Sequence, residues 1–156
     1  MDIISCPIKF SSLPIFYFKD KFFLNDVRCS IVRKPYEVNK KWYIMIKILD
    51  NNIIDSIHKT DEAFISKFSN TFFKKSMFTN CDLDLTPNIL ICKIPYRYKK
   101  FEISSFDEDG HFMSCYDFLI NDLVSCDISH ACFSSNTSSH SYISSWKLLK
   151  IKKLKL

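Results

Sequence analysis

The chain has 156 residues, of which 47% are hydrophobic and only one is glycine, and its formal net charge is +5. A P-loop, a dinucleotide-binding G-x-G-x-x-G turn and a G-x-S-x-G nucleophile elbow each need several glycines, because backbone must approach a phosphate or adopt a positive φ without a Cβ. With Gly110 alone, the sequence excludes recognisable forms of these sites, and with them P-loop NTPases, nicotinamide-dependent enzymes and α/β-hydrolases.

Two strands are predicted in the N-terminal third of the chain. Residues 27–33 and 42–49 are rich in β-branched and aromatic side chains, which favour strands. Lys34-Pro35 is expected to end the first strand, because proline cannot donate to a ladder. Asp50-Asn51-Asn52 is expected to form a turn after the second, since asparagine tolerates the left-handed conformation.

An amphipathic helix is predicted next, beginning near Thr60 as N-cap, with Asp61 and Glu62 complementing the helix dipole. Its apolar stripe consists of Phe64, Ile65, Phe68 and Phe72, and Lys74 and Lys75 lie at its end. Such a stripe is typical of a helix that covers a sheet, so we assign these rings to the core.

The C-terminal half is expected to be mostly strand. Residues 89–94 and 96–103 form extended segments separated by Pro95, and Asp107-Glu108-Asp109-Gly110 forms a hairpin turn in which Gly110 supplies a positive φ. Residues 116–120 fit a short helix or strand equally well. The remaining elements are a strand over 124–133, a Ser-rich loop over 134–145, a last strand from about Tyr142, and a basic strand or tail over 147–156.

This order of elements, without repeated βα units, predicts a mainly β (β-rich α+β) protein with a single domain over residues 1–156. We expect a small, partly open OB-like barrel with one covering amphipathic helix, and a compact α+β sheet is the alternative. Small barrels usually place glycine at bulges and corners, so any barrel in this chain should be irregular or open.

The cellular compartment is indicated by the absence of recognisable targeting and membrane-spanning segments in the sequence and by the number of cysteines. The N-terminus resembles no secretory signal, and no window approaches the roughly 18 apolar residues of a membrane span, so we expect an intracellular protein without a membrane partner. Seven cysteines, an odd number, favour reduced and mostly buried thiols over a disulfide framework.

The net charge is unevenly distributed. Residues 1–101 carry 17 Lys and Arg against 10 Asp and Glu, whereas residues 102–146 carry seven acids and no Lys or Arg. The last ten residues carry five lysines and no acid. This asymmetry indicates a protein with one cationic face, although an ordinary solvated surface would also account for it.

Catalytic and metal-binding alternatives rest on few residues. A zinc site could be composed from His111, Cys115, Cys126, His130 and Cys132, but the chain has no C-x-x-C pair, and buried thiols with surface histidines are the simpler interpretation. A Cys–His nucleophilic pair stays open, with nothing to single out one cysteine. Asp82 with Asp84, or Asp107 with Asp109, could bind a divalent metal in a nuclease. We expect no catalytic residue, cofactor or metal.

Three segments place aromatic rings beside cations, a pattern that suits single-stranded nucleic acid, because rings stack on bases while cations follow phosphates. In an extended segment over 96–101, Tyr96 and Tyr98 alternate with Arg97 and Lys99. The predicted nucleic-acid-binding residues are Trp42, Tyr43, Lys93, Tyr96, Arg97, Tyr98, Lys99, Lys100, Trp146, Lys147 and Lys150. Strand alternation implies that some of these rings face the core instead.

The C-terminal part of the chain, residues 85–156, resembles the OB-fold single-stranded DNA-binding proteins of large double-stranded DNA viruses. The similar features are Lys93-Ile94-Pro95 followed by Arg97, Tyr98 and Lys99, the Asp109-Gly110 turn, and a closing strand with Ser145-Trp146-Lys147. The resemblance implies non-enzymatic coating of exposed DNA during viral replication or recombination, in the host nucleus or cytoplasm.

Single-stranded DNA binding is therefore the first hypothesis, with RNA as a possible competitor and self-association or replication proteins as possible partners. The alternative is a viral structural or interaction protein whose basic surface binds an acidic partner. A metal-dependent nuclease is the third hypothesis.

Overall fold

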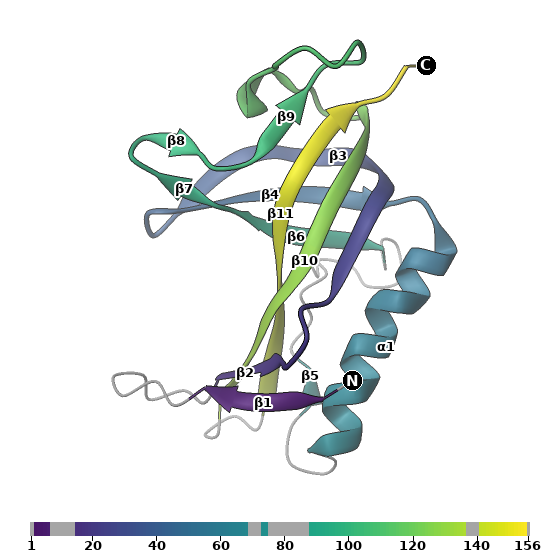
Figure 1. Ribbon diagram of the computed structural model, residues 1–156, viewed down its shortest axis with the longest axis vertical. Coiled ribbons are helices and arrows are strands. Elements are labelled where there is room, and N and C mark those ends of the chain that lie inside the picture. The colour runs from purple at the N-terminus through teal and green to yellow at the C-terminus, as the bar shows by residue number, and fades with distance from the viewer. Residues whose placement is uncertain (1, 7–14, 69–72, 75–87, 137–140, 156) are drawn as a thin grey trace.

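Five strands rich in β-branched and aromatic residues form a barrel (Figure 1). The computed structural model describes the chain except for residues 1, 7–14, 69–72, 75–87, 137–140 and 156. The barrel strands are β3 (Phe23–Val38), β4 (Lys41–Ile48), β6 (Ile89–Ile94), β10 (Leu123–Asn136) and β11 (Ser141–Lys153). The predicted mainly β fold, a small OB-like barrel with one helix, is confirmed.

The ring of strands runs β3–β4–β6–β11–β10 and returns to β3. Neighbouring strands are antiparallel except at the seam between β6 and β11, where Trp146 pairs with Cys92 and Lys147 with Lys93. The barrel is therefore closed, whereas the sequence predicted a partly open one, and its shortest ladder is this parallel pairing of β6 with β11. Register shifts along β3 and β10 provide the irregularity that the single glycine predicts.

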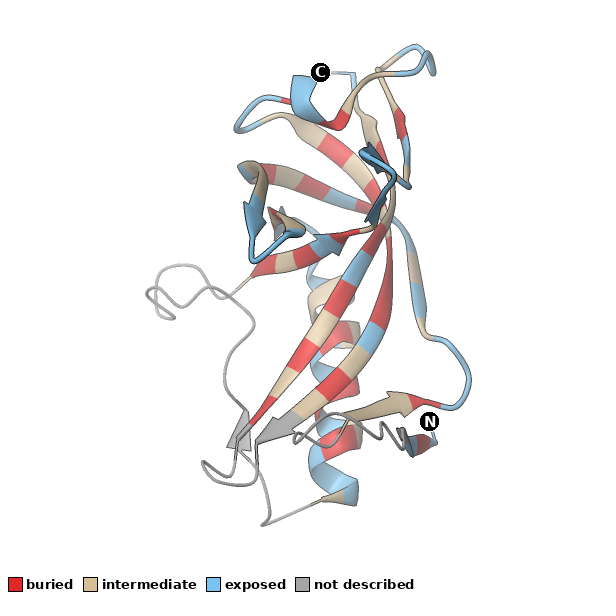
Figure 2. Ribbon diagram, turned by 90° about the vertical axis from the view of Figure 1, so that its left-hand side faces the viewer, coloured by how far each residue is buried: buried red, intermediate tan, exposed pale blue. Residues whose placement is uncertain are grey.

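Alternating side chains fill the barrel, and they form the red bands along the strands in Figure 2. Ile44, Ile46 and Ile48 of β4 are fully buried, while the residues between them face outward. The members of this core are Val27, Cys29, Ile31, Ile44, Ile46, Ile48, Ile57, Leu90, Cys92, Ile94, Cys115, Phe118, Val124, Cys126, Ile128, Trp146, Leu148 and Ile151. The interior is thus packed with side chains, so a ligand has to bind on the outer surface of the barrel.

The one α-helix among the described residues, α1 (Asn51–Lys67), begins well before Thr60, so the predicted start is wrong. Its N-cap is Asp50, whose Oδ1 accepts a hydrogen bond from the Asn52 backbone N–H at 2.8 Å. Thr60 lies buried inside the helix, and its hydroxyl donates to the Ile57 carbonyl. Aspartate and asparagine favour caps as well as turns, which explains the error.

A second, smaller core lies beyond one end of the barrel, where β10 and β11 extend past it and α1 runs alongside (Figure 1). Its buried members are Ile3, Phe18, Phe64, Phe133 and Tyr142. The surrounding strands are β1 (Ile3–Cys6), β2 (Ile15–Phe18) and β5 (Phe73–Lys74). Phe64 and Phe68 join this core as predicted, Lys74 belongs to β5, and Phe72 and Lys75 lie outside the described residues.

The hairpin of β10 and β11 also corrects the predicted Ser-rich loop over 134–145. Ser134 pairs with Ile143, and Asn136 pairs with Ser141, so most of this segment is strand. Ladder hydrogen bonds involve backbone groups only, and Phe133 and Tyr142 anchor this part of the hairpin in the second core. The expected basic strand is confirmed as far as Lys153.

Short elements connect β6 to β10 along the chain. They are the two-stranded ribbon β7 (Tyr96–Arg97) and β8 (Lys100–Phe101), β9 (Ser104–Phe106) beside β11, and the 3-10 helix η1 (Cys115–Asp117). The turn after β9 has Gly110 at φ 86°, as predicted, and the Gly110 N–H donates to the Asp107 carbonyl. Over the described ranges, no helix has the length and apolar character needed to cross a membrane.

Candidate nucleic-acid interface

Two tyrosines and two lysines form a continuous row across the outside of the barrel. Tyr36 of β3 pairs with Tyr43 of β4, Tyr43 pairs with Lys93 of β6, and Lys93 pairs with Lys147 of β11. Inward-facing neighbours such as Ile44, Cys92 and Trp146 confirm that the row points outward, because successive strand residues alternate sides. We call these four residues the tyrosine–lysine row.

At the tyrosine end of the row, the two aromatic rings lie close together and Arg33 adds a cation. The centroids of the Tyr36 and Tyr43 rings lie 5.9 Å apart, and the Arg33 guanidinium carbon lies 3.7 Å from the Tyr36 ring centroid. Burial raises the pKa of Tyr36 above the usual 10.0, and the nearby Arg33 partly offsets that increase. The Tyr36 hydroxyl is therefore neutral at physiological pH and adds no negative charge beside the lysines.

The strand that carries Tyr36 continues through Pro35, where the sequence predicts that it ends. Pro35 lies in a register shift between Arg33 and Tyr36, a place where the ladder needs no donor from proline. Sequence reasoning therefore missed Arg33 and Tyr36 as members of the outer face. The sequence signal for these two residues is Pro35 itself, because a proline inside a strand-like run is typical of a bulge, through which the strand can continue.

The ribbon of β7 and β8 projects from the barrel directly after the row, because Lys93 is followed by Ile94, Pro95 and Tyr96. We call residues 96–101 the basic ribbon. At its tip, Tyr98 and Lys99 both have positive φ, 53° and 61°, and the Tyr98 side chain is 86% exposed. Arg97 forms an ion pair with Glu102 at 3.7 Å, and both side chains are largely solvent-accessible.

Aromatic rings hold the base of the basic ribbon. The Trp42 centroid lies 5.7 Å from Tyr96, 5.2 Å from Phe101 and 5.6 Å from Tyr116. The Glu102 N–H also donates to the Pro95 carbonyl at 2.8 Å, closing the ribbon on the barrel side. Trp42 and Tyr96 thus support the basic ribbon and remain partly accessible to solvent. The exposed part of the ribbon consists of Arg97, Tyr98, Lys99 and Lys100.

Trp146 does not belong to this surface, which corrects its assignment as a binding residue. Its side chain is 2% exposed, and its ring packs against Phe22 and His130 with centroid distances of 6.1 and 5.1 Å. Because Trp146 faces inward, its neighbour Lys147 faces outward. Of the predicted Trp-Lys pair, only Lys147 can reach a ligand.

The C-terminal lysines divide between two environments. Lys150 is half-buried beside Asp127 on the neighbouring strand, with its Nζ 5.9 Å from the Phe106 ring centroid. Lys153 forms ion pairs with Glu108 and Asp122, and Lys155 pairs with Asp109 at 3.3 Å. The acidic segment therefore neutralises the end of the basic strand, away from the tyrosine–lysine row.

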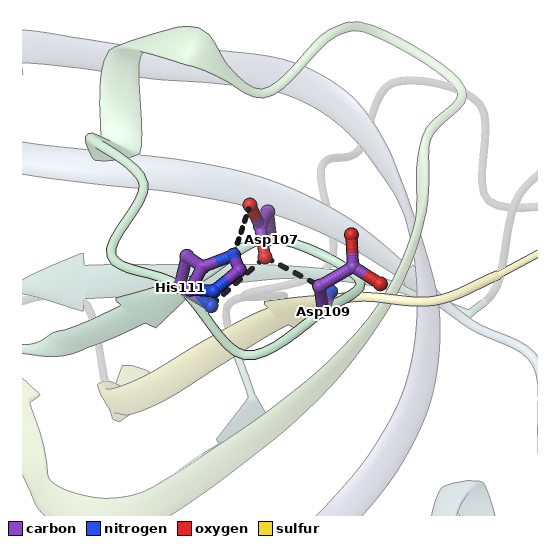
Figure 3. Close-up of side chains that lie close together, drawn as sticks. All are labelled: Asp107, Asp109 and His111. Carbon is purple, nitrogen blue, oxygen red and sulfur yellow. Dashed lines mark hydrogen bonds and ion pairs between the residues drawn. The ribbon is translucent and has the colours of Figure 1, made fainter.

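The metal candidates do not assemble as a buried site. Among the residues that the structure describes, the one group close enough to share an ion is Asp107, Asp109 and His111 (Figure 3). Asp107 Oδ1 accepts from the backbone N–H groups of Asp109 and His111, both at 2.9 Å, so this carboxylate stabilises the turn. These hydrogen bonds, chiefly that from His111, lower the pKa of Asp107.

The residues considered for a zinc site do not come together, since no three of them lie close enough to share an ion in the part of the chain that the structure describes. Cys115 and Cys126 are buried in the barrel, and burial raises the pKa of Cys115 to about 12, so its thiol stays protonated. His130 Nε2 lies 2.9 Å from the Ser144 hydroxyl, in the second-core region away from His111. The alternative nuclease pair, Asp82 and Asp84, lies outside the described residues.

Comparison of the chain with protein-family models, with curated proteins and with solved structures finds no significant match.

Proposed function

We propose that this protein binds single-stranded DNA without catalysing a reaction, through the tyrosine–lysine row and the basic ribbon. The observation that carries the proposal is the register of the row, which places Tyr36 and Tyr43 side by side and continues directly into Lys93 and Lys147. Rings can stack on exposed bases, and the lysines can follow the phosphates of the same strand.

The location of the row within the barrel supports this function. β4 and β6 are the second and third strands of the five-stranded barrel in chain order. In OB-folds, the face of the second and third strands is the one that binds oligonucleotides. The row crosses this face, and the basic ribbon follows directly from β6, so a bound strand would meet both.

Stacking and phosphate contacts are largely independent of base sequence, which suits a protein that covers exposed DNA. We therefore infer a role in protecting single strands during DNA replication or recombination. The resemblance of residues 85–156 to viral single-stranded DNA-binding proteins extends the proposal to viral DNA synthesis inside an infected cell. Such a role requires affinity and strand preference, and it requires no catalytic residue or cofactor.

Fluorescence anisotropy with labelled oligonucleotides tests the proposal. We expect micromolar or tighter binding to a mixed-sequence single strand at low salt, weaker binding to the matching duplex, and a steep loss of affinity as salt increases. The Tyr43→Ala variant should bind about 5- to 150-fold more weakly, which corresponds to the roughly 1–3 kcal/mol of one stacked base.

The Tyr43→Phe variant is the matched control, because it keeps the ring and should keep most of the affinity. An RNA oligonucleotide of the same sequence measures whether RNA competes. Absence of binding at low salt would refute the proposal. Equal binding to single strand, duplex and a polyanionic peptide would instead favour an interaction protein that recognises an acidic partner.

A further inference from the structure

A hollow of about 290 Å³ lies outside the barrel, where β2 and the start of β3 meet the outer side of β10 and β11. We propose, building on the proposed function, that this hollow receives one nucleotide of the strand bound along the tyrosine–lysine row. The DNA path then extends beyond the β4–β6 face. The lining residues are Tyr17, Phe18, Lys21, Phe23, Ser129, His130, Ala131, Lys147 and Leu149.

The hollow continues the row in register. Lys147, the last member of the row, pairs with Ser129 of β10, and Ser129 pairs with Phe23 of β3. Neighbouring strands lie about 4.8 Å apart, so Phe23 follows Lys147 after roughly 10 Å along the barrel surface. Lys147 is thus shared between the end of the row and the wall of the hollow.

The chemistry of the wall matches a nucleotide. Phe23 is 48% exposed although it is a large apolar ring, and Tyr17 lies half-buried nearby in the lining. Lys21 and Lys147 supply two exposed cations, and the residues that line the hollow include no acid. A base could stack on the Phe23 ring while its phosphate meets a lysine, and the volume lies just below the roughly 300–1,000 Å³ of pockets for drug-sized ligands.

The segment that carries Lys21 is held at both ends. The Lys19 N–H donates to the Asp2 carbonyl at 2.8 Å, and the His130 N–H donates to the Phe22 carbonyl at 2.9 Å. Phe18 packs edge-on against His130 and Phe133, with centroids 5.0 and 5.4 Å away. The wall is therefore formed before a ligand arrives, which lowers the entropic cost of binding.

Oligonucleotide length separates this inference from the proposed function. An oligothymidine of about 4 nucleotides should cover the tyrosine–lysine row alone, whereas one of about 12 should also reach the hollow. We expect the Phe23→Ala and Lys21→Ala variants to bind the longer strand about 5- to 10-fold more weakly, within the range for one stacked base, and the shorter strand unchanged.

Two control variants sharpen the length experiment. Phe23→Trp keeps a flat ring and should retain the affinity, and Lys19→Ala removes an exposed lysine outside the lining and should affect neither length. If the wild type binds neither oligonucleotide, the proposed function fails. If the wild type binds and the Phe23 and Lys21 variants match it, or weaken both lengths equally, only the hollow is refuted.

Photochemical cross-linking gives a second readout that does not depend on the folding of a variant. The longer oligothymidine is synthesised with 5-iodouracil in place of thymine, bound to the wild-type protein and irradiated. Adducts on Tyr17 or Phe23, mapped by mass spectrometry, are the expected result. Adducts confined to Tyr36 and Tyr43 would overturn the inference while supporting the row.

Discussion

Tyr98 and Lys99 occupy the left-handed region of backbone space, with φ 53° and 61°, at the tip of the basic ribbon. This region is unfavourable for residues with a Cβ, by roughly 1–2 kcal/mol each, and most hairpins of this type use Asn-Gly or Asp-Gly there. The exposed Tyr98 ring therefore occupies a position that stability alone would assign to a smaller residue.

The Lys99→Gly variant should consequently be more stable than the wild type, by about 0.5–1 kcal/mol in free energy of unfolding, because glycine adopts positive φ without strain. Urea denaturation followed by circular dichroism measures this difference. Lys100→Gly is the matched control, since Lys100 lies in β8 and glycine weakens strands. A Lys99→Gly variant less stable than the wild type would contradict the strain argument.

Residue types alone could predict which segments carry rings and cations, but not which side of a strand each ring occupies. Tyr43 and Lys147 were expected at the surface and lie there, while Trp146 enters the core. The inward and outward sides depend on register, and bulges along β3 and β10 shift that register. Pro35 marks one of these bulges, whereas the others contain no proline or glycine that would reveal them.

At the scale of elements, the second core depends on α1. Phe64 is fully buried, and its ring lies 4.5 Å from both Phe133 and Tyr142 and 5.6 Å from Phe16, measured between centroids. These contacts join the helix to the extended end of the β10–β11 hairpin and to β2. The helix therefore holds one wall of the hollow in place through β2.

The Phe64→Ala variant should lower the free energy of unfolding by about 3–5 kcal/mol, the usual cost of a large cavity in a core. Ile65→Ala is the control, because Ile65 is 43% exposed on the same helix and should change stability by less than about 0.5 kcal/mol. Thermal or chemical denaturation distinguishes the two. Similar small effects of both changes would show that the helix contributes little.

Strands in which apolar and polar residues alternate could be predicted from the sequence. Polar segments that suit turns as well as helices or strands could not. The strands over 42–49 and 89–94 were expected within one residue of their observed bounds, because β-branched residues alternate there between core and surface. The first half of α1 and the Ser-rich part of the hairpin were missed. Their polar residues suit turns equally well, and only tertiary contacts such as those of Ile57 and Tyr142 decide between the conformations.

At the scale of the whole molecule, the structure brings together charges that the sequence keeps in separate segments. The acids of residues 107–122 and the lysines at the end of β11 neutralise each other near the C-terminus. The tyrosine–lysine row and the basic ribbon lie on other parts of the barrel. Five cations, Lys93, Arg97, Lys99, Lys100 and Lys147, therefore lie exposed on the candidate interface, and of these Arg97 pairs with Glu102.

Charge removal at two positions tests this separation. We expect Lys147→Ala to weaken binding to single-stranded DNA and to reduce the salt dependence, with a change of about 0.7 in the slope of log affinity against log salt. Lys155→Ala removes the same charge from an ion-paired position and should leave the slope unchanged. Equal effects of both substitutions would indicate a diffuse attraction to net charge.

The parallel seam between β6 and β11 has a consequence for the protein without its ligand. Its two residue pairs include Lys93 beside Lys147, so like charges repel each other where the barrel has its shortest ladder. A phosphate between the two ammonium groups would turn this repulsion into attraction. Under the proposed function, the bound strand would thus help to hold the barrel shut, and selection for a more stable seam would act against keeping lysine at positions 93 and 147.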